Sequence, residues 1–120
     1  MQFKNTDELK AALRGHIGTT QYHRNGFCLP HTDGVADLIE IASCHWWISD
    51  MSVVARMKPK VRAHNFQVWK LVVKGGKATS YIEDGNDNLL YKQSYSMTDF
   101  PEGEFSVWVE GGIIILPSEH

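Results

Sequence analysis

The chain has 120 residues and a net charge of −2, and its size suits a single domain, residues 1–120, built around one hydrophobic core. Because there is no surplus of basic residues to neutralise phosphates, the composition argues against non-specific binding to nucleic acid. Two cysteines cannot form a disulfide framework, and the start of the sequence lacks the apolar run of a signal peptide. No segment is long and apolar enough to cross a membrane. We therefore expect a cytoplasmic protein with reduced thiols.

The first half of the chain, residues 1–60, is predicted to be helical. Thr6 is expected to cap the first helix, because two acidic residues follow it in the first turn, where the helix dipole favours them. Apolar residues at helical spacing give this helix a buried stripe, and Gly15 is placed as its C-terminal stop. The first helix is therefore predicted over residues 6–14.

A second helical stretch is predicted over residues 33–57, with Thr32 or Asp33 as its N-cap. The buried stripe of its first part does not line up with the apolar face of its second part. We therefore expect a kink or break near residues 43–45. Pro59 is expected to end the helical half.

Residues 64–117 are predicted to be strands, because segments rich in β-branched and aromatic residues alternate with turn signals such as two double glycines. The expected strands cover residues 66–73, 78–83, 89–95, 104–110 and 113–116. Strands joined by such short turns must be antiparallel. The expected fold class is α+β, with the N-terminal helices packed on one face of a four- to five-stranded antiparallel sheet. The last strand is apolar on both faces, so we expect it inside the sheet or under a helix.

Residues 44–51 place two tryptophans and one carboxylate on a largely apolar helix. At about 100° per residue, Asp50 projects near the middle of the apolar face. A buried carboxylate is costly unless it is paired or hydrogen-bonded, so Asp50 should have a partner such as a tryptophan indole N–H, a tyrosine hydroxyl, a backbone amide or a histidine. We expect Asp50 to be mostly buried and bonded to residues 16–35, with Thr19, Tyr22 or a backbone amide as its partner. Asp50 is then either a structural acid or a site acid. Both tryptophans are expected to be core residues.

Two pairs of cysteine and histidine raise the question of a structural zinc site, which usually has four nitrogen or sulfur ligands. One pair is Cys28 with His31, and the other is Cys44 with His45. Adjacent residues on one helix point in different directions, so we predict that no zinc is bound. Residues 84–88 resemble the opening of a calcium loop but lack its later glycine and glutamate, and we interpret them as a polar hairpin turn. We expect no metal and no cofactor.

The segment Gly18–His23, followed by Asp33, is the most site-like part of the chain. It is dense in side-chain donors and acceptors and lies between two predicted helices, and loops carry function more often than cores do. The candidate binding residues are Thr19, Tyr22, His23, Asp33 and Asp50. A structural alternative stays open, in which the loop forms a tight turn and Tyr22 packs.

Several short motifs, in their order and spacing, carry a family resemblance. They are Gly18-Thr19-Thr20-Gln21-Tyr22, Thr32-Asp33-Gly34-Val35, Trp47 with Asp50, Phe66-Gln67-Val68-Trp69, Glu83-Asp84-Gly85-Asn86, Thr98-Asp99-Phe100-Pro101 and Leu116-Pro117-Ser118-Glu119. From about Gly18 to its end, the chain resembles an uncharacterised family of small proteins from bacteria, phages and mobile elements, a domain of unknown function. The resemblance implies a bacterial or phage cytoplasmic setting and assigns no catalytic residue. Aromatic residues are common in that family where this chain has His31 and His45, which is a further argument against a metal site.

Two classes of function follow from these observations. The first is a small non-catalytic binding module, such as an inhibitor or accessory protein of a mobile element that acts on a host protein. It rests on small size, acidic balance and the lack of a catalytic signature. The second is a small enzyme or ligand-binding domain with a site formed by the Gly18–His23 loop, Asp33 and Asp50. We favour the first, with another protein as partner; nucleic acid and membrane are not expected, and a homodimer stays open.

Overall fold

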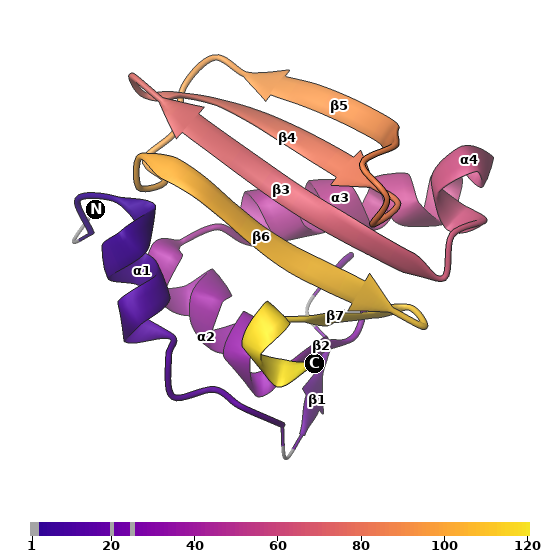
Figure 1. The fold of residues 1–120 in the computed structure, drawn as a ribbon, viewed down its shortest axis with the longest axis horizontal. Helices are drawn as coiled ribbons and strands as arrows, with labels where there is room; N and C mark the ends of the chain where they lie inside the picture. Colours follow the sequence, from indigo (N-terminus) through magenta and orange to yellow (C-terminus); the bar gives the residue numbers. More distant parts are fainter. Residues whose placement is uncertain (1–2, 20, 25) are drawn as a thin grey trace.

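The computed structural model describes residues 3–19, 21–24 and 26–120, which form a seven-stranded sheet with helices packed against it (Figure 1). The helices are α1 (Thr6–Ala12), α2 (Asp33–Ala42), α3 (His45–Met57), α4 (Pro59–Arg62) and the 3-10 helix η1 (Pro117–Glu119). The strands are β1 (Tyr22–His23), β2 (His31–Thr32), β3 (Phe66–Lys74), β4 (Lys77–Glu83), β5 (Leu89–Tyr95), β6 (Gly103–Glu110) and β7 (Ile113–Ile115). Within these ranges, no helix has the length and apolar character needed to span a membrane.

The expected α+β class is confirmed, whereas the sheet is larger than the four to five antiparallel strands expected. Its order is β1-β2-β7-β6-β3-β4-β5, and β2 pairs with β7 in parallel, His31 opposite Ile114. The five expected strands are β3 to β7. The strands β1 and β2 were missed, because a two-residue strand has no alternation to detect. β7 lies between β2 and β6, so its apolar residues are inside the sheet, as expected.

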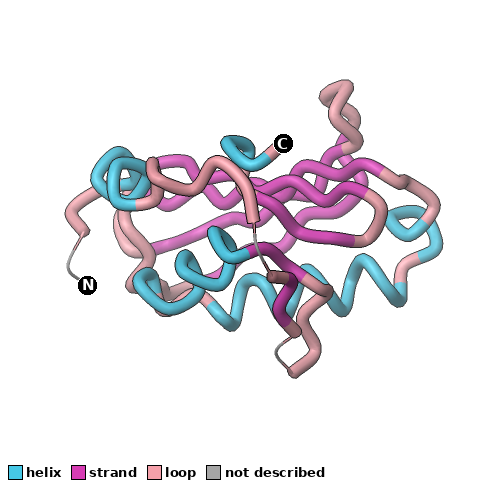
Figure 2. The backbone as a smooth tube through the Cα atoms, turned by 90° about the horizontal axis from the view of Figure 1, so that it is seen from below, coloured by secondary structure: helices cyan, strands magenta, loops and turns pink. Residues whose placement is uncertain are grey.

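The helices α2 and α3 cover one face of the sheet (Figure 2). Buried and half-buried residues alternate along β3, and the fully buried Trp69 belongs to the face that packs on these helices. Trp47 of α3 is also fully buried, and its indole N–H donates to Ser80 Oγ of β4 at 2.9 Å. The expected core role therefore holds fully for Trp47, whereas Trp46 is only half-buried.

The helix boundaries differ from the expected ones at three places. Asn5, not Thr6, caps α1, because its side chain accepts a 3.0 Å hydrogen bond from the backbone N–H of Glu8. α1 also ends before Gly15 is reached. Pro59 begins the short helix α4 instead of ending the helical half, because proline suits the first position of a helix.

The expected break near residues 43–45 is confirmed. Thr32 caps α2, with its hydroxyl oxygen accepting from the backbone N–H of Val35 at 3.4 Å. Ser43 ends α2 in the left-handed conformation, with a φ of 51°, and α3 begins two residues later. The change of direction lets both helices turn their apolar stripes toward the sheet.

The C-terminal segment is tied to the start of α2 through Glu119. Its carboxylate accepts hydrogen bonds from the Thr32 hydroxyl at 2.5 Å, the Gly34 backbone N–H at 3.2 Å and the Leu116 backbone N–H at 2.9 Å. A Cβ at Gly34 would lie 2.6 Å from the Leu116 side chain and 2.8 Å from Glu119, so this close approach requires glycine. Two motifs far apart in the sequence therefore form one structural unit.

Candidate functional site

Asp50 lies on α3 and faces the edge strand β5. Its carboxylate accepts a 2.9 Å hydrogen bond from the Tyr95 hydroxyl, so the expected pairing with Thr19, Tyr22 or a nearby amide is wrong. Asp50 is also half-buried rather than mostly buried. Helical periodicity gives the direction of a side chain, but it does not tell which strand the fold places opposite. Burial, and then the bond to Asp50, raise the pKa of Tyr95, so its hydroxyl stays a donor at neutral pH.

The Asp50–Tyr95 pair lines a hollow of about 720 Å³, which we call the Asp50 hollow. Its walls come from the end of α2, the β3–β4 hairpin and the segment that follows β5. Trp46 packs edge-on against Tyr95 inside it, with ring centroids 4.8 Å apart. An indole, a phenol and a carboxylate thus meet at one opening, an arrangement that can orient a small polar ligand.

Three of the five candidate residues, Thr19, His23 and Asp33, meet at the start of α2. Thr19 Oγ1 accepts from the backbone N–H of Asp33 at 3.0 Å and donates to a loop carbonyl at 2.5 Å. His23 Nε2 lies 2.7 Å from Asp33 Oδ1, and the His23 ring stacks on that of His31 with centroids 5.9 Å apart. These bonds fasten the loop to the helix. Tyr22 does not pack, because it is 63% exposed.

The structure does not bring Asp50 to the other four candidates. Asp33 is the first residue of α2, whereas the opposite end of that helix lines the Asp50 hollow. At about 1.5 Å per residue, the helix separates the two places by about 14 Å. The single site expected from the Gly18–His23 loop, Asp33 and Asp50 is therefore two separate places. Thr20, which belongs to that loop, lies outside the described residues.

The cysteines and histidines that raised the question of zinc do not converge. Among the residues that the structure describes, no group of three or more His, Cys, Asp or Glu side chains could hold a metal ion. Burial raises the pKa of the Cys44 thiol to about 12, which disfavours the thiolate that zinc requires. His31 is buried, which lowers its pKa, and its Nδ1 donates to the Leu29 carbonyl at 2.8 Å. Residues 84–88 form the polar turn expected, with Asp84 accepting two backbone N–H bonds.

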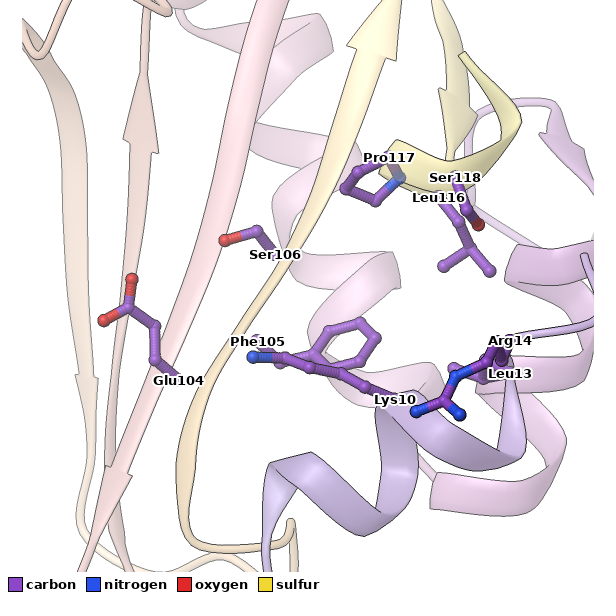
Figure 3. A pocket seen from close by; sticks show the side chains of 9 residues that line it. All are labelled: Lys10, Leu13, Arg14, Glu104, Phe105, Ser106, Leu116, Pro117 and Ser118. Atoms are coloured by element: carbon purple, nitrogen blue, oxygen red, sulfur yellow. The ribbon is translucent and has the colours of Figure 1, made fainter. Parts of the chain in front are cut away.

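A pocket that the sequence did not indicate lies between α1, β6 and η1 (Figure 3). It has a volume of about 630 Å³, and we call it the α1–η1 pocket. Its lining residues are Lys10, Leu13, Arg14, Glu104, Phe105, Ser106, Leu116, Pro117 and Ser118. The spacing of Lys10 and Arg14, four residues apart beside the apolar stripe, is the signal that could have indicated one wall. The other wall comes from the far end of the chain, which no sequence pattern joins to α1.

The chain belongs to a family of unknown function (DUF6876), whose model matches residues 7–120. The expected membership of an uncharacterised domain family is therefore confirmed. The match begins before Gly18, so it includes most of α1, which the short motifs did not reach. No curated protein and no solved structure matches the chain.

Proposed function

We propose that this member of the DUF6876 family is a non-catalytic binding module of a bacterium, phage or mobile element, which acts in the cytoplasm on another protein as an inhibitor or accessory factor. The proposed docking surface is the open sheet face, the face of β3, β4 and β6 that α2 and α3 leave uncovered (Figure 2). Its central residues are Val68, Lys70, Val72, Tyr81 and Trp108. The observation that carries the proposal is that these side chains lie side by side and partly exposed.

The strand register places these residues in adjacent rows. Val68 of β3 lies opposite Trp108 of β6, and Lys70 of β3 lies opposite Tyr81 of β4. Each is partly exposed, whereas its neighbours along the strand are buried. Strand alternation therefore separates the core face from a face that presents aromatic and aliphatic groups to solvent.

The open sheet face also has a charged centre. Lys70 Nζ lies 3.4 Å from a carboxylate oxygen of Glu83 and 3.8 Å from one of Glu104. Nearby, the ring of Trp108 packs edge-on against Phe66 with centroids 5.6 Å apart. Aromatic side chains beside satisfied polar groups are typical of protein interfaces, where buried aromatic residues supply much of the binding energy. This composition supports a protein as the partner.

Site-specific photo-crosslinking in a bacterial host tests the proposal. A photoreactive residue at position 72 lies on the open sheet face, and one at position 40 lies on the exposed surface of α2. We expect one adduct of defined mass from position 72, none from position 40, and loss of the adduct with Tyr81→Glu but not with Glu40→Ala. An adduct with the mass of two chains would identify a homodimer. Equal adducts from both positions, or none from position 72, would contradict the proposal.

A ligand-binding function at the Asp50 hollow is the second candidate. It is favoured by one observation, the meeting of Asp50, Tyr95 and Trp46 at an opening of about 720 Å³. The His23–Asp33 contact does not add to this site, because it lies at the other end of α2. The two functions differ in their dependence on Asp50: Asp50→Asn should abolish ligand binding in the hollow and leave partner binding by the open sheet face unchanged.

A further inference from the structure

We propose that the α1–η1 pocket binds a carboxylate that carries an apolar tail, an activity beyond the protein binding proposed for the open sheet face. Three features of the pocket carry this proposal: an apolar floor, two cationic side chains on the wall formed by α1 and the turn after it (Figure 3), and an edge of β6 that has no strand partner along residues 104–106 in the part of the chain that the structure describes. None of the five candidate residues from the sequence lines it.

The floor of the pocket is apolar and continuous with the core. Leu13, Phe105 and Leu116 are 3%, 4% and 3% exposed, and Pro117 stands beside them at the rim. A volume of about 630 Å³ is in the range of sites for small organic ligands. An apolar tail laid over these side chains would leave water, which is the main favourable term for such a ligand.

Lys10 and Arg14 give the pocket its positive charge. Both side chains are exposed, and within the described ranges neither forms an ion pair with another residue. Figure 3 shows both entering from the α1 side, across from the wall that carries Leu116. An anionic head group held by the two cations would make charge-assisted hydrogen bonds, which are about twice as strong as neutral ones.

The lining of the pocket also contains one negative charge, the carboxylate of Glu104. Glu104 stands at the β6 side of the pocket and lies 3.8 Å from Lys70 of β3. Two cations and one carboxylate leave the lining with a net charge of +1. A carboxylate, with one negative charge, costs less to remove from water into this apolar pocket than a phosphate monoester, with close to two, because the desolvation cost rises with charge.

The edge of β6 that borders the pocket carries backbone N–H groups that can donate hydrogen bonds to a ligand. β7 pairs only with Trp108, Val109 and Glu110 of β6, so the earlier part of β6 has a strand partner on the β3 side alone in the structure described. Successive N–H groups of a strand point to opposite edges. At least one N–H of residues 104–106 therefore faces the pocket and can donate to the carboxylate or to an amide behind it.

Titration of ¹⁵N-labelled protein followed by NMR tests the proposal, with decanoate, decanol and acetate as probes. Decanoate should cause saturable shifts in the amide signals of Leu13, Phe105 and Ser118. Decanol, which keeps the tail and loses the charge, should bind about tenfold more weakly, and acetate, which loses the tail, should cause no saturable shift. Saturable decanoate shifts confined to other parts of the protein, or equal affinities for decanoate and decanol, would overturn the proposal.

Matched charge variants separate the pocket from the overall charge of the protein. Lys10→Gln with Arg14→Gln should weaken decanoate binding about tenfold or more and leave the affinity for decanol unchanged. Lys58→Gln with Arg62→Gln removes the same charge from the exposed end of the helical half and should leave both affinities unchanged. Equal losses in the two double variants would show a diffuse charge effect and would also overturn the proposal.

The source of the carboxylate is decided by two further probes. A hexapeptide that ends in leucine with a free C-terminus, and the same peptide with an amidated C-terminus, present the same chemistry on a polypeptide. Tighter binding of the free peptide than of decanoate would identify a protein C-terminus as the ligand. Binding of decanoate but not of the free peptide would identify a free aliphatic acid as the ligand. Equal binding of the free and amidated peptides would contradict a role for the carboxylate.

Discussion

Replacement of Tyr95 by phenylalanine should show how strongly the Asp50–Tyr95 bond holds α3 to β5. The bond is 2.9 Å long and joins a hydroxyl to a carboxylate, and a hydrogen bond to a charged group contributes about 1.5–3 kcal/mol to folding. Both residues are half-buried beside the Asp50 hollow, so water can replace the lost donor, and we expect a loss of about 1 kcal/mol. For a domain of this size the melting temperature should fall by about 3–6 °C.

Thermal melts followed by circular dichroism measure this loss, with Tyr91→Phe as the matched control. Tyr91 lies on the same strand, but its hydroxyl donates to Gln93 within β5, so its removal should not loosen α3. Asp50→Asn keeps an acceptor and should cost less than Asp50→Ala. Equal melting temperatures for Tyr95→Phe and the wild type would refute the structural role of the bond. If both Asp50 variants lost ligand binding with little change in melting temperature, Asp50 would be a site acid.

The same pair gives the pH dependence of stability a defined sign. Burial, and then the bond to Asp50, raise the pKa of Tyr95 in the folded state, whereas a tyrosine in the unfolded chain has a pKa of about 10. The contribution of this group is therefore fully present below about pH 10 and is lost as the pH rises further. The advantage of the wild type over Tyr95→Phe should therefore keep its full size up to about pH 10 and shrink as the pH is raised above that value. An advantage that stayed constant would contradict the raised pKa.

Four further predictions concern the C-terminal contact, zinc and the thiols. Gly34→Ala should destabilise the fold by about 1–3 kcal/mol, because the Cβ of the alanine would clash with Leu116. Glu119→Gln should destabilise it by about 1–2 kcal/mol, because a neutral amide oxygen accepts hydrogen bonds more weakly than a carboxylate. Denaturant titration measures both losses. Elemental analysis of protein purified without chelator should find no stoichiometric zinc, and zinc that disappears in Cys28→Ser or Cys44→Ser would refute this. Because burial raises the pKa of Cys44 to about 12, a thiol reagent near pH 8 should label it only after unfolding, and rapid labelling of the native protein would contradict its burial.

The parts of the fold that depend on neighbouring residues were predictable from the sequence. The double glycine at positions 75 and 76 adopts positive φ values of 62° and 75° and forms the expected turn. The mismatch of apolar stripes correctly placed the break at Ser43. By contrast, β1 and β2 are strands only because β1 pairs with β2 and β2 pairs with β7. No local sequence pattern could indicate these pairings. The N-cap of α1 was misplaced by one residue because Asn5 and Thr6 are both good caps, whereas the predicted start of the helix at residue 6 is confirmed.

The candidate site was less predictable, because its geometry depends on which distant segments meet. The helical projection correctly turned Asp50 toward the protein, but the sheet order made Tyr95 its partner. One wall of the α1–η1 pocket comes from each end of the chain.

The motifs at residues 32–35 and 116–119, through which the chain resembles its family, meet at Glu119, and their polar groups bond to one another. Groups that satisfy each other in this way hold the fold and have little left to offer a ligand. We therefore expect binding specificity to come from side chains with unused charge such as Lys10 and Arg14 and from the exposed residues of the open sheet face, while residues 116–118 contribute only the shape of the α1–η1 pocket.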